Sequence, residues 1–119
     1  MKASAIADAF VEPRWPPRRY HYYYVRGKLA SDPLYPGVVA ALRGSDAPLL
    51  DLGCGIGLLA HALRDDGQAM PYAGVDFDPG KIDIANNAAQ RADLPGVAFA
   101  TCDLVRDRPS HRGSVALLD

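Results

Sequence analysis

Four short apolar runs stand out along the chain, and each is bounded by Gly, Pro or Asp. They are APLLDL (47–52), PYAGVDF (71–77), GVAFATC (96–102) and GSVALLD (113–119). Runs of this length and composition are typical of strands that are buried on both faces of a parallel sheet. The pattern therefore predicts four strands at these positions.

Helical patterns alternate with these runs. After the first run, apolar residues recur at helical spacing and Gly67 is a natural stop. After the second run, Asp78 is a good N-cap, Pro79 suits the first helical position and an apolar face follows. The stretch YPGVVAALRG (35–44) predicts another short helix ahead of the first strand. The apolar positions of the two inner helices are Leu58, Leu59, Ala62 and Leu63, then Ile82, Ala85, Ala89 and Ala92. This alternation predicts an α/β fold, a doubly wound parallel sheet with right-handed crossovers.

Composition narrows the class of protein. The chain has 119 residues, of which 49% are hydrophobic and 23% charged, as in a globular protein of about one modest domain. No apolar run is close to the length of a membrane span, about 18 residues, and MKASAIADAF (1–10) makes a poor signal peptide. We therefore expect a cytoplasmic protein without a membrane span. Cys54 and Cys102 have neither zinc-site nor disulfide-framework spacing, and the histidines are scattered, so we expect no metal site.

Charge is spread unevenly along the chain. Residues 1–28 hold six basic and two acidic side chains, although the whole chain has a net charge of −1. The same segment contains WPPRRYHYYYVRGK, in which aromatic and cationic residues interleave. Such a stretch could stack on and neutralise nucleic acid. We favour instead a proline-stiffened arm, residues 1–33, that folds over a domain formed by residues 34–119 and lends side chains to its pocket.

A glycine-rich turn follows the first predicted strand, in the sequence LLDLGCGIGLLA (49–60). In a doubly wound sheet, a turn at this position binds a nucleotide or a related ligand. Two readings fit. GIGLLA (55–60) matches the dinucleotide pattern G-x-G-x-x-G/A, and Asp76 lies where a ribose-binding acid belongs. Read from Asp51, the same stretch has the pattern D-x-G-x-G-x-G. Because Asp51 beside a pyrophosphate would be penalised by like charge, this second reading favours a ligand without phosphate.

The second reading resembles the first motif of class I S-adenosylmethionine-dependent methyltransferases. Four stretches resemble that family in order: LLDLGCGIG at the turn, GVDFDP (74–79), FATCDL (99–104) and GSVALLD. The resemblance covers about Pro48 to Asp119. It implies a Rossmann-like sheet, S-adenosyl-L-methionine as the cofactor and S-adenosyl-L-homocysteine as the product.

The resemblance also implies a role for each matching residue. The Gly53–Gly57 backbone would face the methionine and ribose parts of the cofactor, and Asp51 the methionine amino group. Asp76 would accept hydrogen bonds from both ribose hydroxyls, and Phe77 would lie against adenine. The adenine amino group would donate to Asp103. The implied cofactor-binding positions are Asp51, Gly53, Cys54, Gly55, Gly57, Asp76, Phe77, Cys102, Asp103, Leu104 and Asp119.

The arm is expected to add further contacts to the cofactor. A methionine carboxylate needs a donor, and Arg26 and Lys28 are the nearest cations in sequence. Tyr24, together with Tyr23, could close over the methyl group and exclude water.

The resemblance predicts an enzyme that methylates a small molecule. Family members carry about seven strands with the fourth inside the sheet, whereas this chain stops at the fourth, so we expect a truncated, N-terminal part of a methyltransferase. Catalytic residues cannot be assigned, nucleic acid is not the expected acceptor, and the exposed last strand should favour self-association. The alternatives are a non-catalytic Rossmann-like module that depends on a partner, and a nicotinamide-dependent oxidoreductase.

Overall fold

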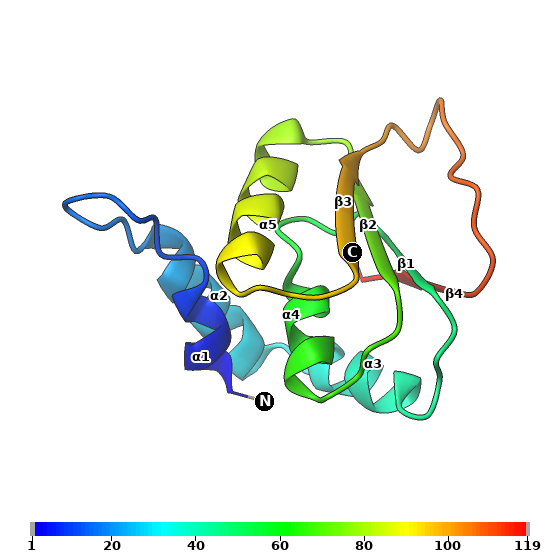
Figure 1. Ribbon diagram of the computed structural model, residues 1–119, viewed down its shortest axis with the longest axis horizontal. Helices are drawn as coiled ribbons and strands as arrows, with labels where there is room; N and C mark the ends of the chain where they lie inside the picture. The colour runs from blue at the N-terminus through cyan, green and yellow to red at the C-terminus, as the bar shows by residue number, and fades with distance from the viewer. Residues whose placement is uncertain (1, 119) are drawn as a thin grey trace.

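One parallel sheet organises the protein in the computed structural model, which describes residues 2–118. Its strands are β1 (Leu49–Leu52), β2 (Tyr72–Asp76), β3 (Val97–Thr101) and β4 (Ser114–Leu117). Each lies inside the apolar run that predicted it. The strand order is β3-β2-β1-β4, and every neighbouring pair is parallel, so the direction of the winding reverses at β1 (Figure 1). The predicted α/β class and its parallel sheet are confirmed.

Three helices were predicted correctly, namely α3 (Leu34–Leu42), α4 (Leu58–Asp65) and α5 (Pro79–Arg91). The predicted N-cap of α5 is confirmed, because the Asp78 carboxylate accepts a hydrogen bond from Gly80 N at 2.9 Å. Helices α4 and α5 cover one face of the sheet, and the segment that joins β3 to β4 runs past the other face (Figure 1). This helix-free segment leaves the second face less covered than the first.

The main core lies between the sheet and α4. Leu49 on β1 and Leu59 and Leu63 on α4 are almost fully buried there. Arg64 holds the far end of this layer together, because its guanidinium donates to the Gln68, Met70 and Pro95 carbonyls at 2.7–3.0 Å. Packing against the sheet therefore holds α4 along its length. At its end, Arg64 links the helix to the connections that lead into β2 and β3.

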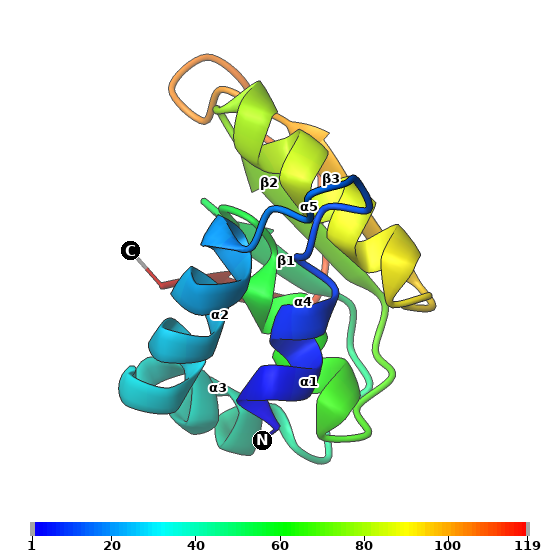
Figure 2. The same cartoon turned by 90° about the vertical axis from the view of Figure 1, so that its left-hand side faces the viewer.

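The N-terminal segment is helical, which the sequence pattern did not predict. It forms α1 (Ala3–Asp8) and α2 (Tyr20–Ser31), which pack side by side against the outer surface of α4 and α5 (Figures 1 and 2). Phe10, just after α1, is buried and its ring contacts the His61 ring at 5.0 Å between centroids. A second hydrophobic core therefore joins this segment to the sheet domain.

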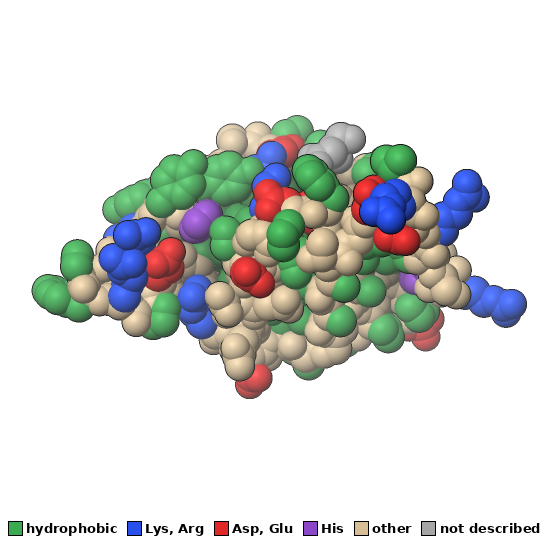
Figure 3. Space-filling model, turned by 90° about the horizontal axis from the view of Figure 1, so that it is seen from above, with side chains coloured by type: hydrophobic (Ala, Val, Ile, Leu, Met, Phe, Trp, Pro, Cys, Tyr) green, Lys and Arg blue, Asp and Glu red, His purple; other side chains and the backbone are tan. Residues whose placement is uncertain are grey.

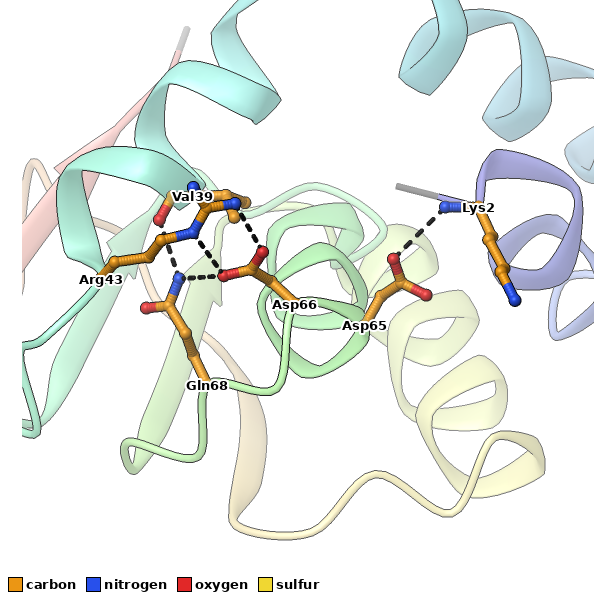
Figure 4. A network of polar contacts seen from close by, with 6 residues as sticks. All are labelled: Lys2, Val39, Arg43, Asp65, Asp66 and Gln68. Atoms are coloured by element: carbon orange, nitrogen blue, oxygen red, sulfur yellow. Dashed lines mark hydrogen bonds and ion pairs between the residues drawn. The ribbon is translucent and has the colours of Figure 1, made fainter.

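A polar network anchors α3 to the end of α4 (Figure 4). The Arg43 guanidinium donates two hydrogen bonds to the Asp66 carboxylate, at 2.7 and 3.0 Å, and holds the pKa of that carboxyl down at about 2. Gln68 donates to the same carboxylate and to the Val39 carbonyl.

Across residues 2–118, no helix is long and apolar enough to cross a membrane.

Candidate functional site

The turn between β1 and α4 requires glycine at several positions. Gly53, Gly55 and Gly57 have φ values of +66°, +59° and +86°, a region that side chains with a Cβ rarely adopt. At Gly57 a Cβ would also lie 2.7 Å from Phe99 Cζ, whereas at Gly55 it would meet open space. The turn is therefore tight on its Gly57 side and open at Gly55, where a ligand can approach the backbone.

Asp51 is buried at the middle of the sheet, with only 3% of its surface exposed. The Tyr72 hydroxyl, on the adjacent strand, donates to Asp51 Oδ2 at 2.5 Å. Burial, together with the negative charge of Asp51, raises the pKa of Tyr72 well above its usual value, so the tyrosine stays a donor. This bond compensates part of the cost of burying a carboxylate.

Asp76 ends β2 and holds the turn from the neighbouring strand. Its Oδ2 accepts a hydrogen bond from Gly55 N at 3.0 Å, and its Oδ1 accepts one from Asp78 N at 2.9 Å. The residue is 7% exposed. Each carboxylate oxygen has two acceptor sites, so both can accept a further hydrogen bond from a ligand hydroxyl.

A cavity of about 350 Å³ opens beside the turn. The turn lines it, together with Leu58 and Leu59 of α4. Tyr20, His21, Tyr24 and Lys28 line it from α2, and Lys81 and Ile84 line it from α5. Seen from the carboxyl end of the sheet, a ridge of hydrophobic side chains with a histidine beside it borders this region (Figure 3).

Charges in the cavity are only partly paired. Lys28 Nζ lies 3.6 Å from Asp32 Oδ2, one helical turn further along the chain. Cys54 also lines the cavity, and burial together with the nearby Asp51 and Asp76 charges raises the pKa of its thiol to about 12. The Cys54 thiol is therefore protonated at neutral pH and is a poor nucleophile.

The structure brings part of the predicted set together. Asp51, Gly53, Cys54 and Gly55 line the cavity with Tyr24 and Lys28, whereas Arg26 is not among its lining residues.

The predicted adenine-side residues lie away from the cavity lining. Phe77 is 77% exposed and Leu104 is 40% exposed. Cys102 N donates to the Asp76 carbonyl at 2.9 Å, which places the start of this segment beside β2. Asp103 is exposed and its Oδ1 accepts from Val105 N at 3.0 Å, so it stabilises a turn. Asp119 lies outside the described residues.

Sequence reasoning missed several lining residues. Those that carry polar groups are Tyr20, His21, Asp32, Tyr35 and Lys81. A signal was present, since Tyr20, Tyr24 and Lys28 recur every fourth residue and so share one face of a helix. Among residues 2–118, no group of three His, Cys, Asp or Glu side chains gathers as a metal site would require.

Comparisons with known proteins find a family and solved structures that resemble this chain. The profile of a family described as a methyltransferase domain matches residues 43–111, which is more than half of the chain. An RNA methyltransferase from Salinibacter ruber, solved with S-adenosyl-L-homocysteine, is 25% identical with a TM-score of 0.59, over 72% of this chain and 57% of that one. No curated protein sequence matches significantly.

Two further solved structures share the fold. A TehB-like SAM-dependent methyltransferase from Corynebacterium glutamicum is 26% identical with a TM-score of 0.55, over 71% of this chain and 44% of that one. Coclaurine N-methyltransferase, bound to N-methylheliamine and SAH, is 16% identical with a TM-score of 0.65, over 78% of this chain and 27% of that one. The chain thus spans between about a quarter and three fifths of the length of these three proteins.

Proposed function

The chain belongs to the methyltransferase domain family, and from this premise we propose that it forms the cofactor-binding part of an enzyme that methylates a small molecule with S-adenosyl-L-methionine. One observation carries the proposal. Two buried carboxylates on adjacent strands, Asp51 one residue before the end of β1 and Asp76 at the end of β2, flank a turn in which three glycines have positive φ. A site of this kind suits a ligand with cationic and hydroxyl groups and no phosphate.

The residues present fit this cofactor. Gly55 leaves its backbone open to a ligand, and Asp76 is within reach of the same turn, where it can accept from ribose hydroxyls. Asp51 would face the methionine amino group and Lys28 its carboxylate, both from the lining of the cavity. Phe77, Cys102, Asp103 and Leu104 would form the adenine side. Asp119 and Arg26 complete the proposed set.

The bound cofactor would supply a methyl group on a positively charged sulfur. In the reaction, a lone pair of the acceptor forms a bond to the methyl carbon, the carbon–sulfur bond breaks, and sulfur keeps the electron pair. The acceptor loses a proton to solvent or to a base, for which no residue is assigned. The part of this chain is to align the two reactants and exclude water, which the enclosed turn and the aromatic side chains of α2 are suited to do.

The lining of the cavity supports a small-molecule acceptor. Tyr24, Ile84 and Leu59 give the cavity apolar walls, which are typical of small-molecule sites. A cytoplasmic location is part of the same proposal, and the free thiols of Cys54 and Cys102 support it.

Calorimetric titration tests the cofactor. We expect S-adenosylhomocysteine to bind the folded chain saturably and nicotinamide adenine dinucleotide to release no heat. Binding of the dinucleotide alone would indicate an oxidoreductase, and no binding of either ligand to a chain with a folded circular-dichroism spectrum would indicate a non-catalytic module.

We also propose that the chain self-associates through β4. Val115 and Leu117 on this edge strand are 59% and 64% exposed, and Ser114–Leu117 carries no charged side chain or proline that would protect the edge. Light scattering should show a mass that rises with concentration, and Val115→Lys should lower it. A wild-type mass that stays monomeric at high concentration would contradict this.

A further inference from the structure

Lys81 is a cation of the cavity lining that has no ion-pair partner among residues 2–118. It lies in the first turn of α5, and with Ile84 it forms the cavity lining on that side. Its backbone N donates to the Asp78 cap, but among residues 2–118 its ammonium group forms no ion pair. The other lysine of the cavity, Lys28, is already paired with Asp32.

The remaining charged groups of the cavity do not offset Lys81. Among the described lining residues the carboxylates are Asp32, which is paired with Lys28, and Asp51, which accepts the Tyr72 hydroxyl at the bottom of the site. The cofactor proposed above carries a sulfonium, an ammonium and one carboxylate of its own, so its binding would add net positive charge to the cavity. A ligand beside Lys81 is therefore favoured if it is negatively charged.

The wall that α2 contributes is aromatic. Tyr20 and Tyr24 line the cavity and are 77% and 46% exposed, so their rings are accessible to a ligand. Aromatic and apolar groups pack well on tyrosine rings. The cavity thus offers an apolar surface on α2 and an unpaired cation together with Ile84 on α5.

We propose that the methyl acceptor is a small aromatic acid, whose acidic group pairs with Lys81 and whose ring packs on Tyr20 and Tyr24. This inference rests on the proposed function and goes beyond it by naming the chemical class of the acceptor. A carboxylate, a sulfonate and a phosphate monoester all carry the negative charge that this pairing requires. The ion pair would be partly open to water, because Lys81 is exposed, so it should contribute selectivity rather than most of the affinity.

Two fluorescent probes with the same rings test the inference. Anilinonaphthalene sulfonate is an aromatic acid, and phenylnaphthylamine is the same molecule without the sulfonate. Both are titrated into the full chain, with and without S-adenosylhomocysteine. Lys81→Met should weaken the sulfonate about five- to tenfold, as expected for one charged partner, and leave the neutral probe unchanged.

Two control variants locate the effect. Tyr24→Ala should weaken both probes, because it removes a ring they share. Lys2→Met, the same substitution on a side chain that points away from the polar contacts of its neighbourhood (Figure 4), should change neither.

Three results would overturn the inference: no saturable sulfonate binding to the wild-type chain, equal loss of both probes in Lys81→Met, or unchanged sulfonate affinity in that variant. If Lys81→Met instead weakens only S-adenosylhomocysteine, then Lys81 holds the cofactor carboxylate and the inference also fails. Failure of the proposed function is a separate result, because it appears as no S-adenosylhomocysteine binding by the wild-type chain.

Discussion

The two sides of the proposed site differ in what holds them in place. On the methionine and ribose side, Asp51 and Asp76 are at most 7% exposed and Gly57 has no room for a Cβ. On the adenine side, Phe77 is 77% exposed and Val105 is 95% exposed. The first side is shaped by the packing of the protein itself, whereas the second is shaped by local turns such as the one at Asp103.

This difference has a consequence for how mutations act. A substitution on the enclosed side must disturb the fold and the ligand together, because the same groups serve both. A substitution on the open side should affect the ligand and leave the fold unchanged, because few of its side chains are buried. The following predictions test this division.

The largest effect on stability is expected at Gly57. Gly57→Ala combines a left-handed φ with a clash against Phe99, and should lower the free energy of unfolding by about 2–4 kcal/mol. Gly55→Ala is the matched control in the same turn, with a positive φ and no clash, and should cost about 1 kcal/mol. Urea denaturation measures both. Equal losses would mean that Phe99 moves aside and that the turn is less enclosed than described.

The free energy of unfolding should depend on pH through His61, which is buried on α4, the helix that follows the turn. Burial lowers the pKa of His61 to about 4, against an unfolded value near 6.5. Since the folded protein favours the neutral ring, this contribution to stability is complete above the unfolded pKa and is lost as pH falls toward 4. Between pH 7 and pH 5 the free energy of unfolding should fall by about 2 kcal/mol. His61→Leu should remove this part of the pH dependence, and an unchanged slope in that variant would contradict the assignment.

On the open side, the effect on ligand binding should exceed the effect on stability. Phe77→Ala should weaken S-adenosylhomocysteine by about 1–2 kcal/mol through lost adenine stacking, and change the free energy of unfolding by less than about 0.5 kcal/mol. Val105→Ala, a control at a still more exposed residue on the same side, should change neither. If Phe77→Ala destabilises the fold as much as it weakens the ligand, the two sides do not differ as described.

The enclosed side was also the more predictable one. The apolar runs identified all four strands, and β1 and β2 are mostly buried, as a continuous apolar run predicts. The predicted burial on both faces is wrong for β4, since Val115 and Leu117 are exposed on the sheet face that no helix covers. The turn was identifiable because its geometry admits little besides glycine. By contrast, α2 was not predicted as a helix, because only Val25 and Leu29 are buried and most of the tyrosines around them are exposed, which gives no clear amphipathic period. Lys81 was missed for a different reason, since only the folded chain brings α5 beside α2.

The most direct test of the account compares two ligands on two proteins. Asp76→Ala should weaken S-adenosylhomocysteine by about 2–4 kcal/mol, because a charged acceptor for both ribose hydroxyls is lost. Wild-type chain should prefer S-adenosylhomocysteine over its deoxyribose analogue, and Asp76→Ala should bind the two equally. The Gly55 amide also donates to Asp76, so the substitution can loosen the turn. Such loosening weakens both ligands alike and therefore does not change the ratio of their two affinities. A preference for the ribose form that persists in folded Asp76→Ala would contradict the proposed cofactor site.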